Sequence, residues 1–258
     1  MLFVEKSGRY SSRKIYELPK FFFSMTKQLY LQDHYQKEFT ATVTKAEGKL
    51  IELDESLFCP EGGGQPSDLG VIHRNSDEFK VLNCGKQGGA IVIGVDKEGL
   101  KVGDKIVGIV DWERRYKLMR SHTAAHVISG YFAKNLGALI TGNQLSLGGG
   151  RIDFNLEQYD KDKIIEAIDE CNKIILQDLP VKIYWMKRED VEKNPQLLKL
   201  AAGLPPGIKE LRIVDIVGFD AQPDGGTHIS HLNEIGRIAF ERADNKGKNN
   251  RRLYFKVI

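Results

Sequence analysis

Alternating hydrophobic and polar positions dominate the chain from about residue 37 to 110. The strand-like runs are EFTATV (38–43), KLIELDES (49–56) after a Glu-Gly turn, AIVIGV (90–95) and KIVGIVDW (105–112). Period-two alternation and β-branched runs separated by glycines and short polar turns predict antiparallel strands. We therefore expect a small antiparallel β-barrel over residues 26–111; a sandwich is the alternative.

Helical spacing begins at residue 112. A first helix is expected over 112–136, ending near Gly137, and a second over about 160–178. In the second helix Ile164, Ile168, Cys171 and Ile175 form one buried stripe, which makes Cys171 a core residue. The remaining elements are strands at 181–186 and 210–217, a short helix near 188–201, a glycine loop at 224–226, strands at about 235–242 and 252–258, and a polar hairpin loop at 242–252. This order predicts an α+β fold, in which a two-layer sandwich over residues 112–258 follows the barrel.

The N-terminal segment does not read as a signal peptide or a membrane span. Its apolar run FFFSM (21–25) is far shorter than the roughly 18 apolar residues a span needs. No small-residue cleavage site follows it. Because Met25 would serve well as a natural domain start, residues 1–25 are interpreted as an N-terminal extension, which is either an addition or the result of a mis-assigned start.

Cysteine usage and charge give weaker information. Three cysteines without a C-x-x-C pair indicate a reducing compartment, so we expect a cytoplasmic protein. The net charge is only +3, yet residues 237–258 hold seven Lys/Arg against two Asp/Glu. Such a patch fits a solvated face and a polyanion-binding surface about equally well.

Two histidines in SHTAAH (121–126) suggest half of a metal site. His122 and His126 lie four residues apart, so both imidazoles project from one helix face toward a common ion. Thr123 stands where a metallopeptidase H-E-x-x-H motif has its glutamate, so a peptidase is not expected. Alone, H-x-x-x-H is also compatible with a packed or solvated histidine pair.

The string DGGTH (224–228) supplies two further ligand types. Asp224 and His228 follow a predicted strand, and the two glycines between them allow a sharp bend and close approach to a ligand. A carboxylate and an imidazole there would complete a site of three or four protein ligands. His231 is a less favourable ligand, and His34 and His73 are expected at the surface.

These strings together resemble one family. SHTAAH, DGGTH and the following NEIG (233–236) are similar to the editing domain of alanyl-tRNA synthetases and their free-standing relatives, the AlaX-type proteins. FCPEGGGQPSDLG (58–70) resembles the glycine-rich motif of the preceding barrel in that family, and VDWERRYKLMRSHTAAH (110–126) resembles its run from barrel into helix. The resemblance covers about residue 26 to the end and includes no aminoacylation domain. It therefore implies a free-standing editing protein with both a barrel and an editing domain.

The resemblance implies one Zn²⁺ per chain, held by His122, His126, Asp224 and His228. The family has cysteine where this chain has Asp224. An aspartate oxygen also binds zinc, but it is a harder ligand than thiolate. Asp224 is therefore either a ligand or the group that positions the attacking water. Cys59 is a weak alternative ligand.

The implied reaction is hydrolysis of the ester in tRNA(Ala) carrying the wrong amino acid, chiefly serine and in some members glycine. A zinc-assisted water would attack this labile bond. Rejecting alanine requires polar groups that bond the serine hydroxyl. The catalytic residues implied are Asp224, Gln144 and Thr141, with Asn143 in the substrate site; a plain turn at TGNQ (141–144) is the alternative.

The glycine-rich block and a basic run are expected to meet the tRNA. Gly62, Gly63, Gly64 and Gln65 would approach the substrate with backbone N–H groups, unless they merely form a tight barrel turn. No Gly-Lys-Ser/Thr follows, so this is not a P-loop. The basic residues Arg114, Arg115, Lys117 and Arg120 would contact phosphates of the acceptor stem.

Two other functions remain open from the sequence. One is a tRNA-binding relative whose metal site has decayed, with Asp224 as the sign of decay. The other is a zinc-dependent hydrolase acting on a different ester. Mischarged tRNA(Ala) is the expected partner, and the chain is expected to be a monomer or weak dimer without a stable protein partner.

Overall fold

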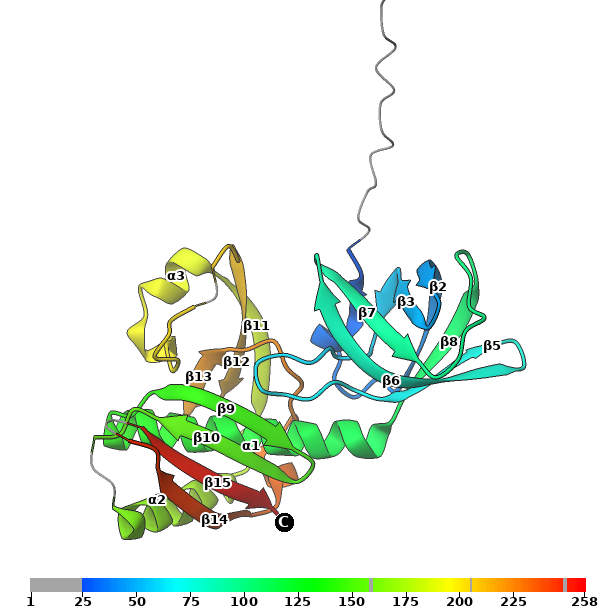
Figure 1. Cartoon of the computed structure of the whole chain (residues 1–258). Coiled ribbons are helices and arrows are strands. Elements are labelled where there is room, and N and C mark those ends of the chain that lie inside the picture. Colours follow the sequence, from blue (N-terminus) through cyan, green and yellow to red (C-terminus); the bar gives the residue numbers. More distant parts are fainter. Residues whose placement is uncertain (1–24, 158–159, 205, 248–249) are drawn as a thin grey trace, which may run out of the picture.

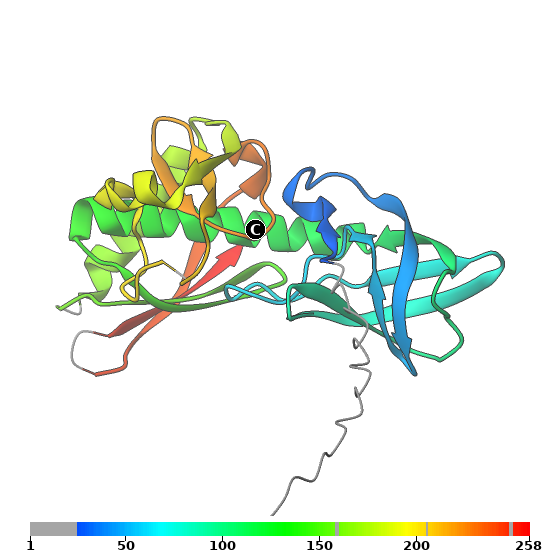
Figure 2. The ribbon, with the colours of Figure 1, turned by 90° about the horizontal axis from the view of Figure 1, so that it is seen from above.

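The computed structural model describes residues 25–157, 160–204, 206–247 and 250–258. These residues form a barrel and a larger α+β part, and the long helix α1 (Trp112–Leu136) joins the two (Figure 1). Viewed from above, barrel and α+β part lie side by side along this helix (Figure 2). The predicted N-terminal extension lies outside the described residues, apart from Met25.

The first part is a closed antiparallel barrel. Its strands, in chain order, are β2 (Glu38–Glu47), β3 (Leu50–Leu53), β5 (Gly70–Arg74), β6 (Asp77–Gln87), β7 (Ala90–Val95) and β8 (Lys105–Val110). The alternating residues of β2 place Phe39, Ala41 and Val43 in the barrel core. The short strands β1 (Lys27–Gln28) and β4 (Glu55–Ser56) pair in parallel beside it, and the 3-10 turn η1 (Leu29–Leu31) follows β1. The barrel prediction is confirmed, and the sandwich alternative is wrong.

The second part contains a four-stranded antiparallel sheet of order β14-β15-β10-β9. The strands are β9 (Ile140–Ser146), β10 (Gly149–Phe154), β14 (Ile238–Asn245) and β15 (Arg251–Val257). One core joins inward-facing residues of this sheet to α1 and α2 (Lys161–Ile175), and it includes Cys171 as predicted. The α+β class is therefore confirmed. The segment TGNQ belongs to β9 rather than to a turn, and the hairpin between β14 and β15 is shorter than predicted because both strands extend into it.

A smaller antiparallel sheet lies above the helix. It consists of β11 (Val181–Lys187), β12 (Glu210–Ile216) and β13 (Asp220–Pro223) in that order, and β13 was not expected from the sequence. The helix α3 (Arg188–Glu192) and the 3-10 turn η2 (Pro195–Leu197) pack on it through a separate small core. A last 3-10 turn, η3 (Leu232–Ile235), follows the DGGTH string. Within the described part of the chain, no helix is long and apolar enough to cross a membrane.

The first turns of α1 anchor it to the barrel. Asp111 caps the helix by accepting a hydrogen bond from the backbone N–H of Arg114, and Gly137 ends the helix in the left-handed region at φ 62°. Arg115 is completely buried: its guanidinium pairs with both carboxylate oxygens of Asp68 and donates to the carbonyl of Leu57 at 2.6 Å. The expected phosphate contact of Arg115 does not fit this position. A buried guanidinium needs such partners, and the sequence pattern could not show that Asp68 supplies them.

Candidate metal centre

His122 and His126 direct their side chains from α1 toward the same position. His122 and His126 are almost fully buried, and their ring centroids are 5.1 Å apart in an edge-to-face arrangement. They are one helical turn apart, so both side chains leave α1 on the same side. This part of α1 is surrounded by protein, because residues from Ser121 to Gly130 are all buried.

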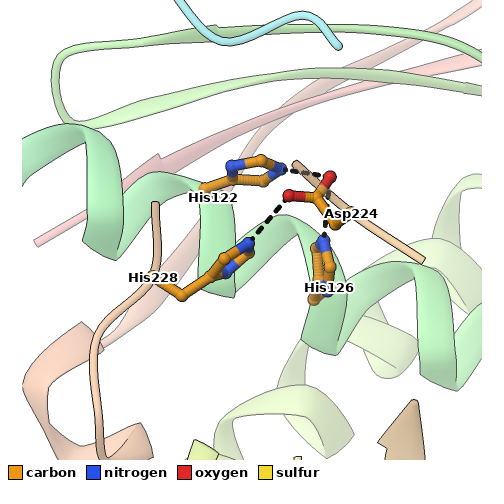
Figure 3. Close-up of side chains that lie close together, drawn as sticks. All are labelled: His122, His126, Asp224 and His228. Carbon is orange, nitrogen blue, oxygen red and sulfur yellow. Dashed lines mark hydrogen bonds and ion pairs between the residues drawn. The ribbon is translucent and has the colours of Figure 1, made fainter. Parts of the chain in front are cut away.

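The loop that follows β13 brings two more ligands to the same point. Asp224 Oδ2 lies 3.3 Å from His122 Nε2 and 3.8 Å from His126 Nε2, while Asp224 Oδ1 lies 3.1 Å from His228 Nε2 (Figure 3). The ligand atoms of all four residues lie within 4.8 Å of one another. The chain thus gathers the metal ligands that the sequence predicts, across about a hundred intervening residues.

The donor set fits zinc. Three imidazole nitrogens and one carboxylate are ligand types that Zn²⁺ accepts, and a group this compact is suited to a small cation. Burial excludes water from these groups, so their charges interact strongly. The residues present therefore fit a zinc ion.

Hydrogen bonds fix the tautomers of two of the rings. His122 Nδ1 lies 2.8 Å from the amide oxygen of Gln65 and so must be the protonated nitrogen. Thr123 donates its hydroxyl proton to the carbonyl of Met119, so its oxygen accepts from His228 Nδ1 at 3.1 Å. Both rings are thereby held through Nδ1, and Nε2, the atom that a metal would bind, is turned toward Asp224. Sequence reasoning assigned Gln65 to the substrate and gave Thr123 no such part.

A glycine makes the Gln65 contact possible. A Cβ on Gly226 would lie 2.4 Å from Cε1 of His122 and 2.7 Å from Oε1 of Gln65, whereas a Cβ on Gly225 would meet nothing within 4 Å. The backbone N–H of Gly226 also donates to Asp224 Oδ1 at 2.6 Å. The expected close approach of this loop is therefore specifically a requirement at Gly226.

The protonation states match a ligand set. Burial raises the pKa of the Asp224 carboxyl, but the neighbouring charge and hydrogen bonds of His122, together with His126 and His228, outweigh burial and hold this pKa well below its usual range. Burial lowers the pKa of His228 well below its usual value, and it also lowers that of His126. An ionised carboxylate is the form that binds metal, and the lowered pKa values of His126 and His228 favour the neutral imidazole that a metal also needs.

A cavity of about 390 Å³ opens onto this centre. Asp224 and Gly225 form part of its wall, and Gly63 of the glycine-rich block contributes another part. Most of the remaining lining belongs to β11, β12 and the segment after α3 and is apolar: Trp185, Leu197, Leu198, Leu200, Leu204, Ile208 and Leu211. A ligand in this cavity would therefore reach the metal centre from the side of the smaller sheet.

The glycine-rich block of the barrel lies against β9. The backbone N–H of Leu145 donates to the carbonyl of Gly64 at 2.8 Å, and a Cβ on Gly64 would lie 2.1 Å from the side-chain oxygen of Asn143. Gly62 and Gln65 bond each other's backbone in a tight turn. Both readings of this block apply: it is a barrel turn, and it brings Gln65 to the metal centre.

The predicted pocket residues of β9 are only partly near the centre. Gln144 pairs with Arg151, whose neighbour Ile152 points into the helix-covered core. Gln144 therefore faces away from α1 and its histidines, and this position does not fit a catalytic role. Thr141 is exposed, and neither it nor Asn143 lines the cavity.

The other histidines behave differently from one another. The prediction that His34 is a surface residue is wrong, because it is buried and its Nδ1 accepts from the backbone N–H of His228 at 2.9 Å. His231 is exposed, and the ligand group found among the described residues contains neither it nor Cys59. Cys59 instead lies with its sulfur 3.6 Å from the amide nitrogen of Gln65.

The other basic residues of α1 are bonded to protein. Arg114 donates to the carbonyl of Ser67 at 3.0 Å, and Arg120 donates to the carbonyl of Ile235 at 2.6 Å. Both keep partial exposure, and Lys117 forms an exposed pair with Glu113. Their phosphate contacts stay predictions.

Comparison with known proteins gives a consistent result. The family described as tRNA synthetases class II (A) matches residues 13–114, and the threonyl and alanyl tRNA synthetase second additional domain matches residues 211–254. The chain is 47% identical to the alanyl-tRNA editing protein AlaX-M of Methanosarcina barkeri, with 91% of this chain and 100% of the relative covered. It is 42% identical to the protein of the same name from Saccharolobus solfataricus, covering 90% and 99%. It is also 36% identical to the alanine–tRNA ligase of Pyrococcus abyssi, but over only 24% of that longer protein.

Proposed function

Because the chain belongs to the family of free-standing alanyl-tRNA editing proteins, we propose that it hydrolyses the ester bond of mischarged tRNA(Ala). Serine is the principal amino acid removed, and glycine is the second. The products are the free amino acid and intact tRNA, so the reaction takes place in the cytoplasm, where charged tRNA is used. The observation that carries this proposal is the four-residue ligand group, of which Asp224 lines a cavity.

The proposal assigns one Zn²⁺ to His122, His126, Asp224 and His228. A zinc ion there would polarise the ester carbonyl and favour ionisation of water at neutral pH. Asp224 acts as a ligand, since both of its oxygens point at ligand nitrogens of the histidines. Of the two sequence-based alternatives for Asp224, the proposal adopts coordination.

The chain's own residues orient the reacting groups. Gln65 and Thr123 hold two imidazoles as single tautomers, and Gly226 N–H holds one oxygen of Asp224. Gly225 leaves open space on the cavity side of Asp224, where an ester can approach. Fixing these groups before the substrate arrives lowers the cost of reaching the transition state.

Selectivity against alanine requires a polar partner for the serine hydroxyl. A pocket that discriminates by size alone admits the smaller alanine, whereas unpaired buried polar groups reject it. Thr141 and Asn143 stay the sequence-based candidates for this contact. The proposal gives Gln144 no contact with the substrate, because its side chain is on the face of the sheet away from α1.

The decisive experiment measures zinc content and hydrolysis of Ser-tRNA(Ala) against Ala-tRNA(Ala), for the parent protein and for Asp224→Ala. We expect one zinc per parent chain, faster hydrolysis of Ser-tRNA(Ala), and loss of both zinc and activity in the variant. Asp169→Ala, an exposed change in the middle of α2, is the matched control and should behave as the parent.

Three results would overturn parts of the proposal. A zinc-loaded parent that leaves Ser-tRNA(Ala) intact but cleaves small esters would support the hydrolase of another ester. A parent that binds tRNA without zinc would support the decayed-site alternative. Unchanged zinc content and activity in Asp224→Ala would rule out coordination by Asp224.

A further inference from the structure

Three residues form a row across the smaller sheet that ends at the metal centre. Trp185 of β11 is directly opposite Arg212 of β12, and Arg212 exchanges hydrogen bonds with Asp224: its carbonyl accepts from the Asp224 N–H at 3.0 Å and its Nη1 donates to the Asp224 carbonyl at 2.8 Å. Adjacent strands are about 4.8 Å apart, so Trp185 lies roughly 10 Å from the Asp224 backbone. The row places an aromatic ring at a fixed distance from the ligand group.

Trp185 is an unusual residue for an open surface. It is 55% exposed, and it lines the cavity together with Leu200 and Ile208, which are each 43% exposed. Large apolar side chains gathered in one concave place mark a binding site more often than scattered ones do. Its neighbour Tyr184, 38% exposed, is next in the strand and so projects from the other face of the sheet; it does not line the cavity.

The cavity is too large for the amino acid alone. Its volume of about 390 Å³ lies in the range of about 300–1,000 Å³ typical of sites for whole small ligands. Serine and glycine carry at most a hydroxymethyl side chain. In an aminoacyl-tRNA the other side of the ester is the ribose of the terminal adenosine, and one sugar separates the ester from an adenine base. The nucleoside is therefore the part of the substrate that needs this space.

Arg212 supplies a polar group suited to that sugar. Only 4% of the residue is exposed, and it lines the cavity. Its Nη1 and Nη2 are bonded to Asp224 and His34, but its Nε finds no acceptor among the described residues. A buried donor without a partner is rare, so this guanidinium at the cavity wall keeps part of its positive charge uncompensated and attracts electronegative oxygens of a ligand.

We propose that this cavity binds the terminal adenosine of the tRNA, with its base stacked on Trp185 and its ribose or phosphate beside Arg212. The inference rests on the proposed function, because it uses the metal centre to position the ester. Aromatic side chains stack on any base, and such a contact typically strengthens binding several-fold or more. Trp185 thus contributes to substrate binding and not to the chemical step.

A fluorescence titration tests the cavity without any reaction. The chain has two tryptophans, so Trp112→Phe leaves Trp185 as the only one. Addition of adenosine 5′-monophosphate should quench the emission of this variant in a saturable way, and ribose 5-phosphate should quench it far less. Equal responses to both compounds, or quenching by free serine alone, would overturn the inference.

Kinetics on Ser-tRNA(Ala) give the second readout. Trp185→Ala should raise KM about tenfold, equivalent to about 1.4 kcal/mol. It should leave kcat nearly unchanged, because the lost contact stabilises the bound substrate and the transition state equally. Trp185→Phe should recover most of the loss, and Tyr184→Ala, the matched control, should not change KM. A KM for Trp185→Ala no higher than that of Tyr184→Ala would sink the inference. Failure of the parent to hydrolyse Ser-tRNA(Ala) would instead count against the proposed function, since the titration is independent of activity.

Discussion

The amide oxygen of Gln65 lies 2.8 Å from Nδ1 of His122. Gln65 belongs to the glycine-rich block of the barrel, and His122 belongs to the helix that carries half of the metal centre. The amide nitrogen of Gln65 is held in turn by the hydroxyl of Thr227 at 3.1 Å. One barrel side chain therefore connects the helix to the DGGTH loop.

Replacing this side chain should weaken metal binding. Gln65→Leu removes the acceptor that fixes the His122 tautomer, and losses of about 10- to 100-fold in metal affinity are typical of such changes. Competition with a chromogenic chelator measures the zinc dissociation constant. Gln87→Leu, an exposed position on the same barrel, serves as the control. Equal affinities in the two variants would show that Gln65 does not orient His122.

Adjacent glycines should differ sharply in their tolerance of a methyl group. Gly226→Ala forces a Cβ to within 2.4 Å of the His122 ring, so that ring or the loop must move. We expect at least tenfold weaker zinc binding and a comparable loss of deacylation. Gly225→Ala meets open space and should keep its zinc. Similar zinc contents in both variants would contradict the close packing at Gly226.

The residue at position 224 should determine how tightly the metal centre binds zinc. Asp224→Cys introduces the thiolate that the family resemblance implies, and zinc favours this softer ligand. We expect Asp224→Cys to bind zinc at least as tightly as the parent, and Asp224→Ala to bind it at least tenfold more weakly. Chelator competition on the three proteins ranks them. A single dissociation constant for all three would mean that position 224 does not coordinate.

The ion pair of Arg115 should matter for stability. Arg115 and Asp68 are both fully buried, so removing one partner leaves an uncompensated charge. Arg115→Ala should lower the free energy of unfolding by about 3–5 kcal/mol. Lys117→Ala, which breaks an exposed ion pair with Glu113 two residues along α1, should leave the free energy of unfolding almost unchanged. Urea denaturation measures both, and a loss below about 1 kcal/mol for Arg115→Ala would refute the structural assignment.

Glu234 should make stability depend on acidic pH. Burial raises its pKa, but hydrogen bonds from Tyr35, Tyr116 and Ser230 outweigh burial and lower the pKa below its usual value. Such a group stabilises the fold above its unfolded pKa of about 4.3, and the contribution disappears as pH falls through the lower folded value. The parent should be more stable than Glu234→Gln near pH 7, by an amount that partial exposure of the group keeps small, and this advantage should decline as pH falls below about 4.3. A difference independent of pH would contradict this ionic contribution.

Local patterns anticipated much of the fold and the ligands. The helix of 112–136 follows from apolar spacing and the glycine after it, and the barrel follows from alternation, both of which are properties of neighbouring residues. His122 and His126 share a face for the same local reason. That Asp224 and His228 meet them was expected from the family resemblance and from the glycine loop, not from periodicity.

The sequence-based predictions that were wrong concern contacts between residues far apart in the chain. His34 and Arg115 are polar residues in polar surroundings along the chain, and each is buried by partners far away in sequence. Gln144 was misplaced because the face that a strand residue takes depends on its pairing register, here with Arg151 of β10. The sequence predicted only two strands of the small sheet that carries Trp185. Its third strand, β13, was missed because it has only four residues.

The uninterrupted helix α1 has one more consequence. Arg115 is held by the barrel and His122 lies in the metal centre, and the seven helical steps from one to the other span about 10.5 Å. The barrel and the metal centre therefore cannot move relative to each other without bending α1 or breaking the buried ion pair between Arg115 and Asp68. If the barrel holds a segment of RNA, as the proposed function allows, the distance from that segment to the metal centre is constant, and a substrate with a longer or shorter 3′ end would place the wrong bond there.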